Sequence, residues 1–159
     1  GVGGAIGIYL GGRAADALSL RFGQQWLPWV VGIVSLGVLP LFYLTFTAET
    51  PISAVAFYAL PAILGTVYVA PGFALIQNVT PIEMRSVAAA INLFMTNIIG
   101  LGLGPFTVGF FSDYFGQTHG LDGLRYGLMV TLVIGLWAVF HYYRCGVSIR
   151  SAAKAGSMS

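Results

Sequence analysis

Six polar side chains of this sequence lie inside long uncharged runs, where hydrogen bonding to a bound solute is the chemistry that they could perform. An amide or hydroxyl buried in apolar surroundings without a partner costs roughly 2–7 kcal/mol, so each must meet another helix or a water-filled cavity. Structural hydrogen bonding and the lining of a solute path are both open interpretations. Asn97 has the better claim to the second, because it lies deepest in its run. The candidates are Tyr58, Tyr68, Gln77, Asn92, Thr96 and Asn97.

A candidate hinge lies in the run that carries Tyr68. Pro61 and Pro71 fall inside this run, and Gly72 follows the second proline. A proline inside a helix removes one backbone hydrogen bond, and its ring clashes with the preceding turn. Pro71 and Gly72 are therefore predicted to form a hinge near the C-terminal end of this segment.

The distribution of charge indicates which elements position these groups. Charged residues make up 8% of the 159 residues, against about 25% in soluble domains, and hydrophobic residues reach 57%. This composition excludes a disordered chain, a nucleic-acid-binding protein and an ordinary water-soluble enzyme. The uncharged runs have about the 20 residues that a membrane-spanning helix needs. They lack the polar stripe of a soluble helix and the alternation of a barrel strand, so they predict an all-α transmembrane protein.

Five spans are predicted, of which the first is only the end of a helix. Gly1 is not Met, and the apolar run 1–12 has no charged segment before it. We therefore expect the C-terminal part of a larger protein, with a transmembrane bundle over residues 1–145. Residues 146–159 are small and polar and predict a tail. The spans cover approximately residues 1–12, 26–46, 53–78, 86–111 and 126–143.

Lysine and arginine predict the orientation of these spans. Six basic residues fall in segments on one side of the bundle, and Arg125 alone falls on the other. The positive-inside rule places the six in the cytoplasm, and with them the C-terminus. The single cysteine, Cys145, cannot form an internal disulfide, and an inert thiol is favoured over palmitoylation. The six basic residues are Arg13, Arg21, Arg85, Arg144, Arg150 and Lys154.

One motif occurs twice, at the ends of two spans. Gly12-Arg13-Ala-Ala-Asp16 and Gly109-Phe-Phe-Ser-Asp113 both have the form G-x-x-x-D. Three predicted crossings separate them, which places them on opposite faces of the membrane. Equivalent helix ends in inverted topology are typical of secondary transporters.

The sequence around these motifs resembles the major facilitator superfamily. Residues 11–16, GGRAAD, followed by 26–29, WLPW, are similar to the loop between its eighth and ninth helices. Residues 69–90 and 97–113 are similar to the tenth and eleventh helices of its bacterial Spinster-like members. The stretch 122–126, DGLRY, fits the entry to the twelfth helix.

The resemblance implies a fold, an activity and partners. The chain would form helices eight to twelve of a 6+6 fold, and its partners would be the missing N-terminal half, the lipid bilayer and a small-molecule substrate. It would move a small organic or amphipathic solute by alternating access in the bacterial inner (plasma) membrane, with no cofactor and no nucleic acid. A non-transporting scaffold or receptor subunit and an inactive truncated fragment are the alternatives.

The resemblance also bears on gating. The family places a basic residue directly after the loop aspartate, but here that position is Ala17, so a pairing of Asp16 with a loop arginine is not predicted. Arg85 is a candidate gating residue because cytoplasmic loop arginines of the family stabilise the state closed on that side. Pairing with Glu83, binding to lipid phosphate and simple topology determination are the other interpretations.

The remaining motifs favour packing over chemistry. The Gly100–Gly104 segment, GLGLG, follows no strand and lies inside a span, so it does not predict a nucleotide site. Small residues recur at helical spacing there and near the N-terminus, which predicts close helix contacts. No metal or catalytic cluster is expected, and no acidic residue lies inside a span to couple transport to protons. The two series are Ala88, Asn92, Thr96, Gly100, Gly104 and Gly3, Gly7, Gly11, Ala15.

Overall fold

The protein is all-helical in the computed structural model, which describes residues 1–156. These residues contain no strand, so the predicted all-α class is confirmed. Seven α-helices are joined by short turns, two 3₁₀ turns and a π-helix. In chain order the elements are α1 (Val2–Phe22), α2 (Trp26–Phe46), α3 (Pro51–Leu64), α4 (Val69–Val79), η1 (Ile82–Met84), α5 (Arg85–Met95), the π-helix η2 (Thr96–Leu103), α6 (Gly104–His119), η3 (Gly120–Asp122) and α7 (Gly123–Gly156).

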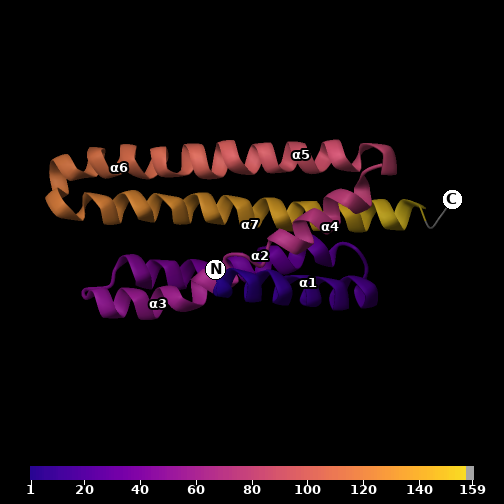
Figure 1. Cartoon of the computed structure of the whole chain (residues 1–159), viewed down its shortest axis with the longest axis horizontal. Helices are drawn as coiled ribbons and strands as arrows, with labels where there is room; N and C mark the ends of the chain where they lie inside the picture. Colours follow the sequence, from indigo (N-terminus) through magenta and orange to yellow (C-terminus); the bar gives the residue numbers. More distant parts are fainter. Residues whose placement is uncertain (157–159) are drawn as a thin grey trace.

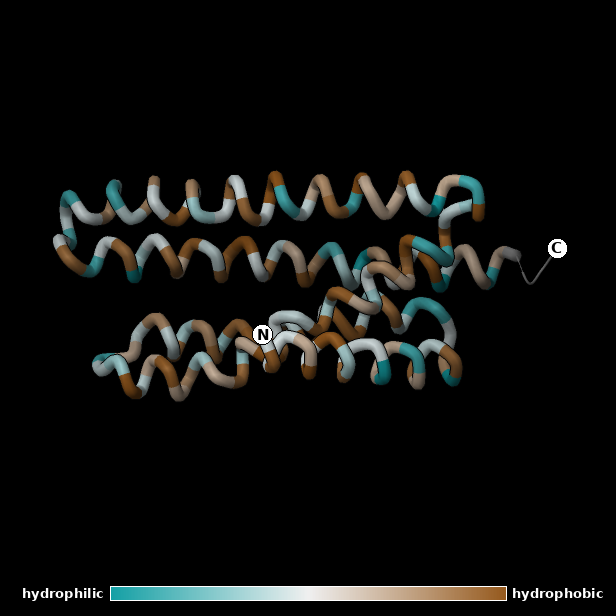
Figure 2. Tube along the Cα trace, viewed as in Figure 1, coloured by the Kyte–Doolittle hydropathy of each residue, from teal (hydrophilic) through white to brown (hydrophobic). Residues whose placement is uncertain are grey.

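Three helical stretches are long and apolar enough to cross a membrane, judged by length and composition. They are Trp26–Phe46, Pro51–Val79 and Ile82–Ala155. The third stretch doubles back at η3, so that α5, η2 and α6 form one leg and α7 the antiparallel return leg (Figure 1). Hydrophobic residues line the legs, and hydrophilic residues gather toward the turns (Figure 2).

The turns carry residue types that explain where the helices end. Gly23 has a φ of 101° after α1, and Gly120 has a φ of 57° after α6; glycine adopts such angles without a steric penalty. The Thr50 and Ser53 side chains form a capping box at the start of α3, with Pro51 at its first position.

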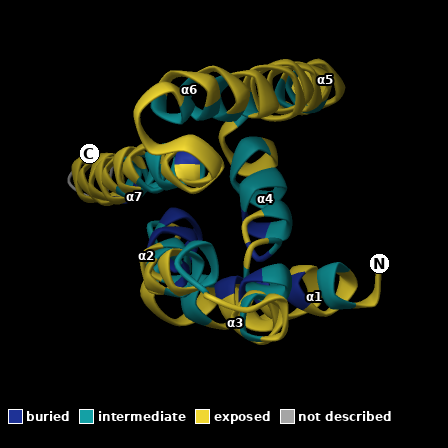
Figure 3. Ribbon diagram, turned by 90° about the vertical axis from the view of Figure 1, so that its left-hand side faces the viewer, coloured by how far each residue is buried: buried dark blue, intermediate teal, exposed yellow. Residues whose placement is uncertain are grey.

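The helices form two layers that α4 connects. α1, α2 and α3 pack together in one layer, and α5, η2, α6 and α7 form the other (Figures 1 and 3). The closed core lies in the first layer, where Ala15, Leu27, Val31 and Val67 are at most 4% exposed. α5, η2 and α6 contain no buried residue within the described chain.

Helix lengths differ from the predicted spans at several places, and one of them is α6, which ends at His119, eight residues past the predicted end at residue 111. α1 continues past the predicted end at residue 12 to Phe22, and α7 continues through the segment predicted as a tail to Gly156. Residues 157–159 of that tail lie outside the described residues. The predicted span 53–78 is interrupted between Leu64 and Val69, whereas α2 covers the range 26–46 as expected.

The turns gather at two ends of the bundle. The α1–α2 turn, the α4–α5 turn and the end of α7 lie at one end, and the α2–α3 and α6–α7 turns lie at the other (Figure 1). This is the alternation that the sequence predicted for its loops. The two G-x-x-x-D motifs accordingly lie toward opposite ends, each about one and a half turns before the last residue of its helix, Phe22 or His119.

Candidate functional site

A cavity lies where α4, α5 and α7 meet. Its volume is about 260 Å³, close to the lower end of the range of roughly 300–1,000 Å³ typical of small-molecule sites. The structure brings four sequence-predicted residues to its wall: Tyr68, Gly72, Asn92 and Thr96. The other residues that line it are Val69, Phe73, Leu93 and Tyr142.

The first wall of this cavity is built by a break in a helix. Between α3 and α4, Thr66, Val67 and Val69 donate backbone N–H groups to the carbonyls three residues before them. Pro71 follows in the first turn of α4; it has no N–H to offer, and its ring clashes with an α-helical carbonyl four residues earlier, at Val67. The predicted hinge pair Pro71–Gly72 therefore lies just after the break, which exposes Tyr68.

The second wall contains a π-helix that sequence reasoning missed. Its first residue is Thr96, and its last, Leu103, comes two residues before Pro105. A proline has no N–H to donate to the carbonyl four residues before it. In π-type bonding, the N–H of the residue after the proline donates to that carbonyl instead. The available signal is the GLGLG-Pro sequence, in which the glycines by themselves predict only helix packing. π-helical segments are frequent at functional sites.

Three predicted pathway residues lie outside the cavity wall. The Asn97 side chain donates to the Leu93 carbonyl of its own helix at 2.7 Å, and it is exposed. The Tyr58 ring lies on α3, with its centroid 6.3 Å from that of Phe42. Gln77 is exposed near the end of α4. The position of a polar residue deep within an uncharged run therefore does not predict whether its side chain lines the cavity.

Tyr68 also borders a second cavity, of about 230 Å³, between α2, α3 and α7. Its walls include Ser35, Gly65 and Thr131 together with aliphatic side chains. Because one tyrosine lines both spaces, the orientation of its ring affects both.

No acidic, basic or histidine side chain lines either cavity among the described residues. Within residues 1–156, no group of three His, Cys, Asp or Glu side chains is arranged to hold a metal ion. The lining combines aromatic rings, hydroxyls and one amide. Such a wall suits a solute that is mostly apolar with a few hydrogen-bonding groups.

The residues of the predicted gating motifs do not pair with one another. Arg13 donates to the Tyr9 hydroxyl at 3.2 Å and lies over its ring, rather than on Asp16. Arg85 donates to the Thr80 carbonyl at 3.4 Å, so in this structure Glu83 is not its partner. Asp16 and Asp113 are exposed. A Cβ at Gly109 would meet no atom within 4 Å, whereas one at Gly12 would lie 3.4 Å from the Ala70 side chain.

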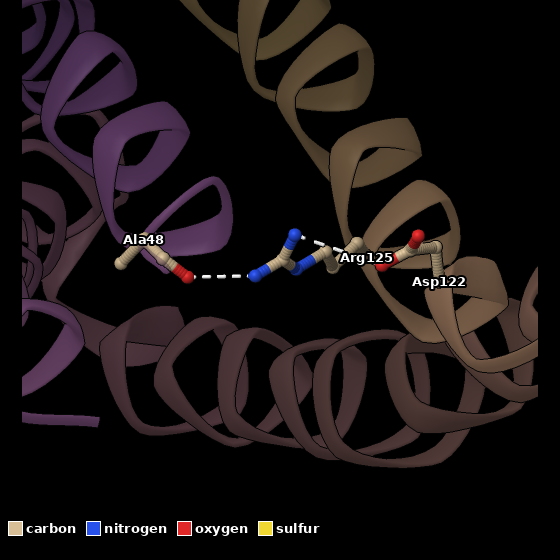
Figure 4. A network of polar contacts seen from close by, with 3 residues as sticks. All are labelled: Ala48, Asp122 and Arg125. Atoms are coloured by element: carbon tan, nitrogen blue, oxygen red, sulfur yellow. Dashed lines mark hydrogen bonds and ion pairs between the residues drawn. The ribbon is translucent and has the colours of Figure 1, made fainter. Parts of the chain in front are cut away.

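The ion pair present in the described chain lies at the opposite end of the bundle. The Arg125 guanidinium is 3.6 Å from Asp122 Oδ1 and donates to the Ala48 carbonyl at 2.7 Å (Figure 4). Ala48 follows α2 and Arg125 lies at the start of α7, so this arginine links the two layers.

The two series of small residues meet different surroundings. In the α1 glycine face (Gly3, Gly7, Gly11, Ala15), a Cβ at Gly7 would overlap the Ile63 carbonyl and one at Gly11 the Val67 carbonyl. The predicted packing role is confirmed there. In the α5–α6 stripe (Ala88, Asn92, Thr96, Gly100, Gly104), a Cβ at Gly100 or Gly104 would meet nothing within 4 Å.

Comparison with known proteins gives one informative similarity. The chain is 37% identical, over 127 residues, to a protein named MFS-type efflux pump from Mycolicibacterium smegmatis. The match covers 80% of this chain and 29% of that relative, so the chain spans less than a third of the relative's length. No family model matches the chain, and no solved structure does. Together with the long apolar helices, the similarity indicates an integral membrane protein that is related to a transporter of the MFS type.

Proposed function

We propose that the chain forms part of a secondary transporter that moves its solute by alternating access. The observation that carries the proposal is the cavity at the junction of two interrupted helices, the α3–α4 break and the π-helix. Transporters place binding sites where irregular backbone lines a cavity inside the membrane, because such backbone is costly against lipid. Sharp kinks in helices occur at prolines and π-bulges, so the break and the π-helix are the points at which we propose that these helices bend.

The lining supports a small organic or amphipathic solute. Tyr68, Asn92 and Thr96 supply hydrogen-bonding groups, and Phe73 and Leu93 supply apolar surface. A fixed charge on the solute would find no opposite charge on this wall. The relative's name is that of an efflux pump, and we propose export from the cytoplasm as the direction of transport.

The chain would act together with the rest of a longer protein. Its match covers 29% of the efflux pump, and the α5–α6 stripe is left open, so we propose that the N-terminal half of the transporter completes the site. In this arrangement the end of the bundle with Arg13, Arg21 and Arg85 faces the cytoplasm of a bacterial cell. Arg85 and the two G-x-x-x-D motifs are proposed to act in gating, with Pro71 and Gly72 beside the bending point. Spinster-like membership stays a prediction.

The test is transport by the full-length protein in proteoliposomes, with an amphipathic fluorescent dye as the solute. We expect Asn92→Leu to lower the initial rate at least tenfold, because it replaces the amide on the cavity wall with an aliphatic group. Asn97→Leu is the matched control: it changes the same residue type, whose amide bonds its own helix outside the wall. Equal losses from both variants would contradict the assignment of the cavity.

The same assay separates the transporter from the alternative of a scaffold. If the wild-type protein inserts and folds but moves no dye or other tested organic solute, the scaffold interpretation replaces the transporter. Circular dichroism and gel filtration of the reconstituted samples establish that folding is unchanged.

A further inference from the structure

An apolar groove runs along the outside of the α2–α7 pair, away from the cavity of the proposed transport site. Its volume is about 380 Å³. Ile33, Leu36 and Tyr143 are each more than half exposed, so the groove is accessible from the surroundings of the helices. The residues that line it are Trp29, Gly32, Ile33, Leu36, Val139 and Tyr143.

One end of the groove is aromatic. Trp29 lies in the first turn of α2, and its indole N–H donates to the Tyr143 carbonyl on α7 at 3.3 Å. Gly146 is buried beneath this indole, and a Cβ there would overlap the ring. Tryptophan and tyrosine gather at the level of lipid headgroups, because they present an apolar body and a polar tip. The groove therefore has a defined headgroup end and an aliphatic end.

Two exposed arginines lie beyond the aromatic end. The Trp29 ring contacts Trp26 at 5.6 Å, Trp26 contacts Phe22 at 5.8 Å, and the Arg21 guanidinium lies 5.1 Å from the centre of the Phe22 ring. On α7, Arg150 follows Tyr143 by about two helical turns, which puts it on the same face. Positive charge thus lies beyond the aromatic end of the groove, from Arg21 on α1 and from Arg150 on α7.

We propose that this groove binds an anionic phospholipid. One acyl chain lies between Trp29 and Leu36, and the headgroup phosphate meets the charges of Arg21 and Arg150. Guanidinium groups bind phosphate well because they carry permanent charge and several donors. Phosphatidylglycerol has a net negative headgroup, whereas phosphatidylcholine has none. The site is independent of the proposed transport activity and requires only that these helices lie in a membrane.

Native mass spectrometry of the detergent-solubilised protein tests the proposal, with dioleoylphosphatidylglycerol and dioleoylphosphatidylcholine as probes. We expect the first phosphatidylglycerol to bind at least fivefold more tightly than phosphatidylcholine. Each of Arg21→Gln and Arg150→Gln should weaken phosphatidylglycerol binding roughly fivefold, the effect of one basic residue near an anionic lipid surface. Neither should change phosphatidylcholine binding.

Two further variants separate this site from general attraction. Arg13→Gln is the matched control for Arg21→Gln, because Arg13 is also exposed on α1 and lies over a ring, that of Tyr9. It should leave the binding of both lipids unchanged. Val139→Trp fills the groove and should abolish the tight phosphatidylglycerol site.

Three outcomes would overturn the proposal. Equal binding of the two lipids would make the groove an ordinary lipid contact. A loss with Arg13→Gln as large as that with Arg21→Gln would mean nonspecific charge attraction. Tight phosphatidylglycerol binding that survives Val139→Trp would place the lipid elsewhere.

Discussion

The α1 glycine face and the α5–α6 stripe have similar sequence patterns and opposite surroundings. Gly7 and Gly11 are buried against the backbone of the α3–α4 break, close enough that any side chain would collide. Gly100 and Gly104 face open space within the described chain. Small residues spaced four apart therefore predict that another segment can pack closely on that face of the helix. They do not identify which segment of the protein packs there.

The backbone explains part of this difference. α1 is a regular helix, so residues four apart stay on one face. The α5–α6 stripe passes through the π-helix Thr96–Leu103, whose wider turns rotate the residues that follow. Asn92 and Thr96 consequently line the cavity while Gly100 and Gly104 do not.

The strongest test of the closed face is Gly11→Ala. The added methyl group would collide with the Val67 backbone, which cannot move aside as a flexible side chain would. We expect the free energy of unfolding to fall by about 1–3 kcal/mol, measured by denaturant titration in detergent micelles. Gly12→Ala is the control, because its Cβ would lie at ordinary contact distance, 3.4 Å from Ala70. Equal effects of the two variants would contradict the close approach.

A smaller loss is expected from Thr66→Val. The Thr66 hydroxyl donates to the Gly4 carbonyl of α1 at 3.0 Å and also contacts the Ile63 carbonyl. Its removal should lower the free energy of unfolding by roughly 0.5–1.5 kcal/mol in the same titration. Thr107→Val removes a bond to the Leu103 carbonyl within the open layer and should cost less. If it costs more, interhelical bonding is not what distinguishes the closed face.

For the open stripe, Gly100→Ala should act in the opposite direction. The methyl group meets nothing within the described chain, and alanine is favoured over glycine in a helix by roughly 0.5–1 kcal/mol. We therefore expect the unfolding free energy of this chain to stay the same or rise. In the full-length protein, transport should fall if another segment packs on the stripe. Destabilisation of the chain by itself would show that the stripe is already covered.

The smallest effect concerns the link between the two layers. The side chains of Arg125 and Asp122 are 44% and 61% exposed. Ion pairs between exposed side chains contribute about 0–1 kcal/mol to the free energy of unfolding. Asp122→Asn should therefore barely change unfolding, and the change should vanish at high salt. Arg125→Ala should cost more because it also removes the hydrogen bond to Ala48. If Asp122→Asn lowers the free energy of unfolding more than Arg125→Ala does, the hydrogen bond from Arg125 to Ala48 is not what links the two layers.

Local signals in the sequence predicted much of the fold. The uncharged runs and the positions of the charged residues predicted an all-α chain, the limits of α2 and the alternation of turns between two ends of the bundle. Interruptions were harder to place: Pro71 indicated a bend, but the break lies one turn earlier, since proline affects the turn before it. Of the predicted pathway residues, Tyr68, Asn92 and Thr96 share a cavity and Tyr58, Gln77 and Asn97 do not, because convergence depends on how separate helices pack.

The length of α7 has a mechanical consequence. Its 34 residues extend about 50 Å at 1.5 Å per residue, whereas the hydrocarbon core of a bilayer is about 30 Å thick. If α7 crosses that core, several turns must stand outside it as a continuous lever arm. A spin label at Ser151, attached as cysteine in a Cys145→Ser background, would sweep a wider arc than one at the exposed position Leu136, nearer the middle of α7, for the same rotation. Pulsed distance measurements at the far end of α7 would therefore magnify small tilts of the bundle that are difficult to detect near its middle.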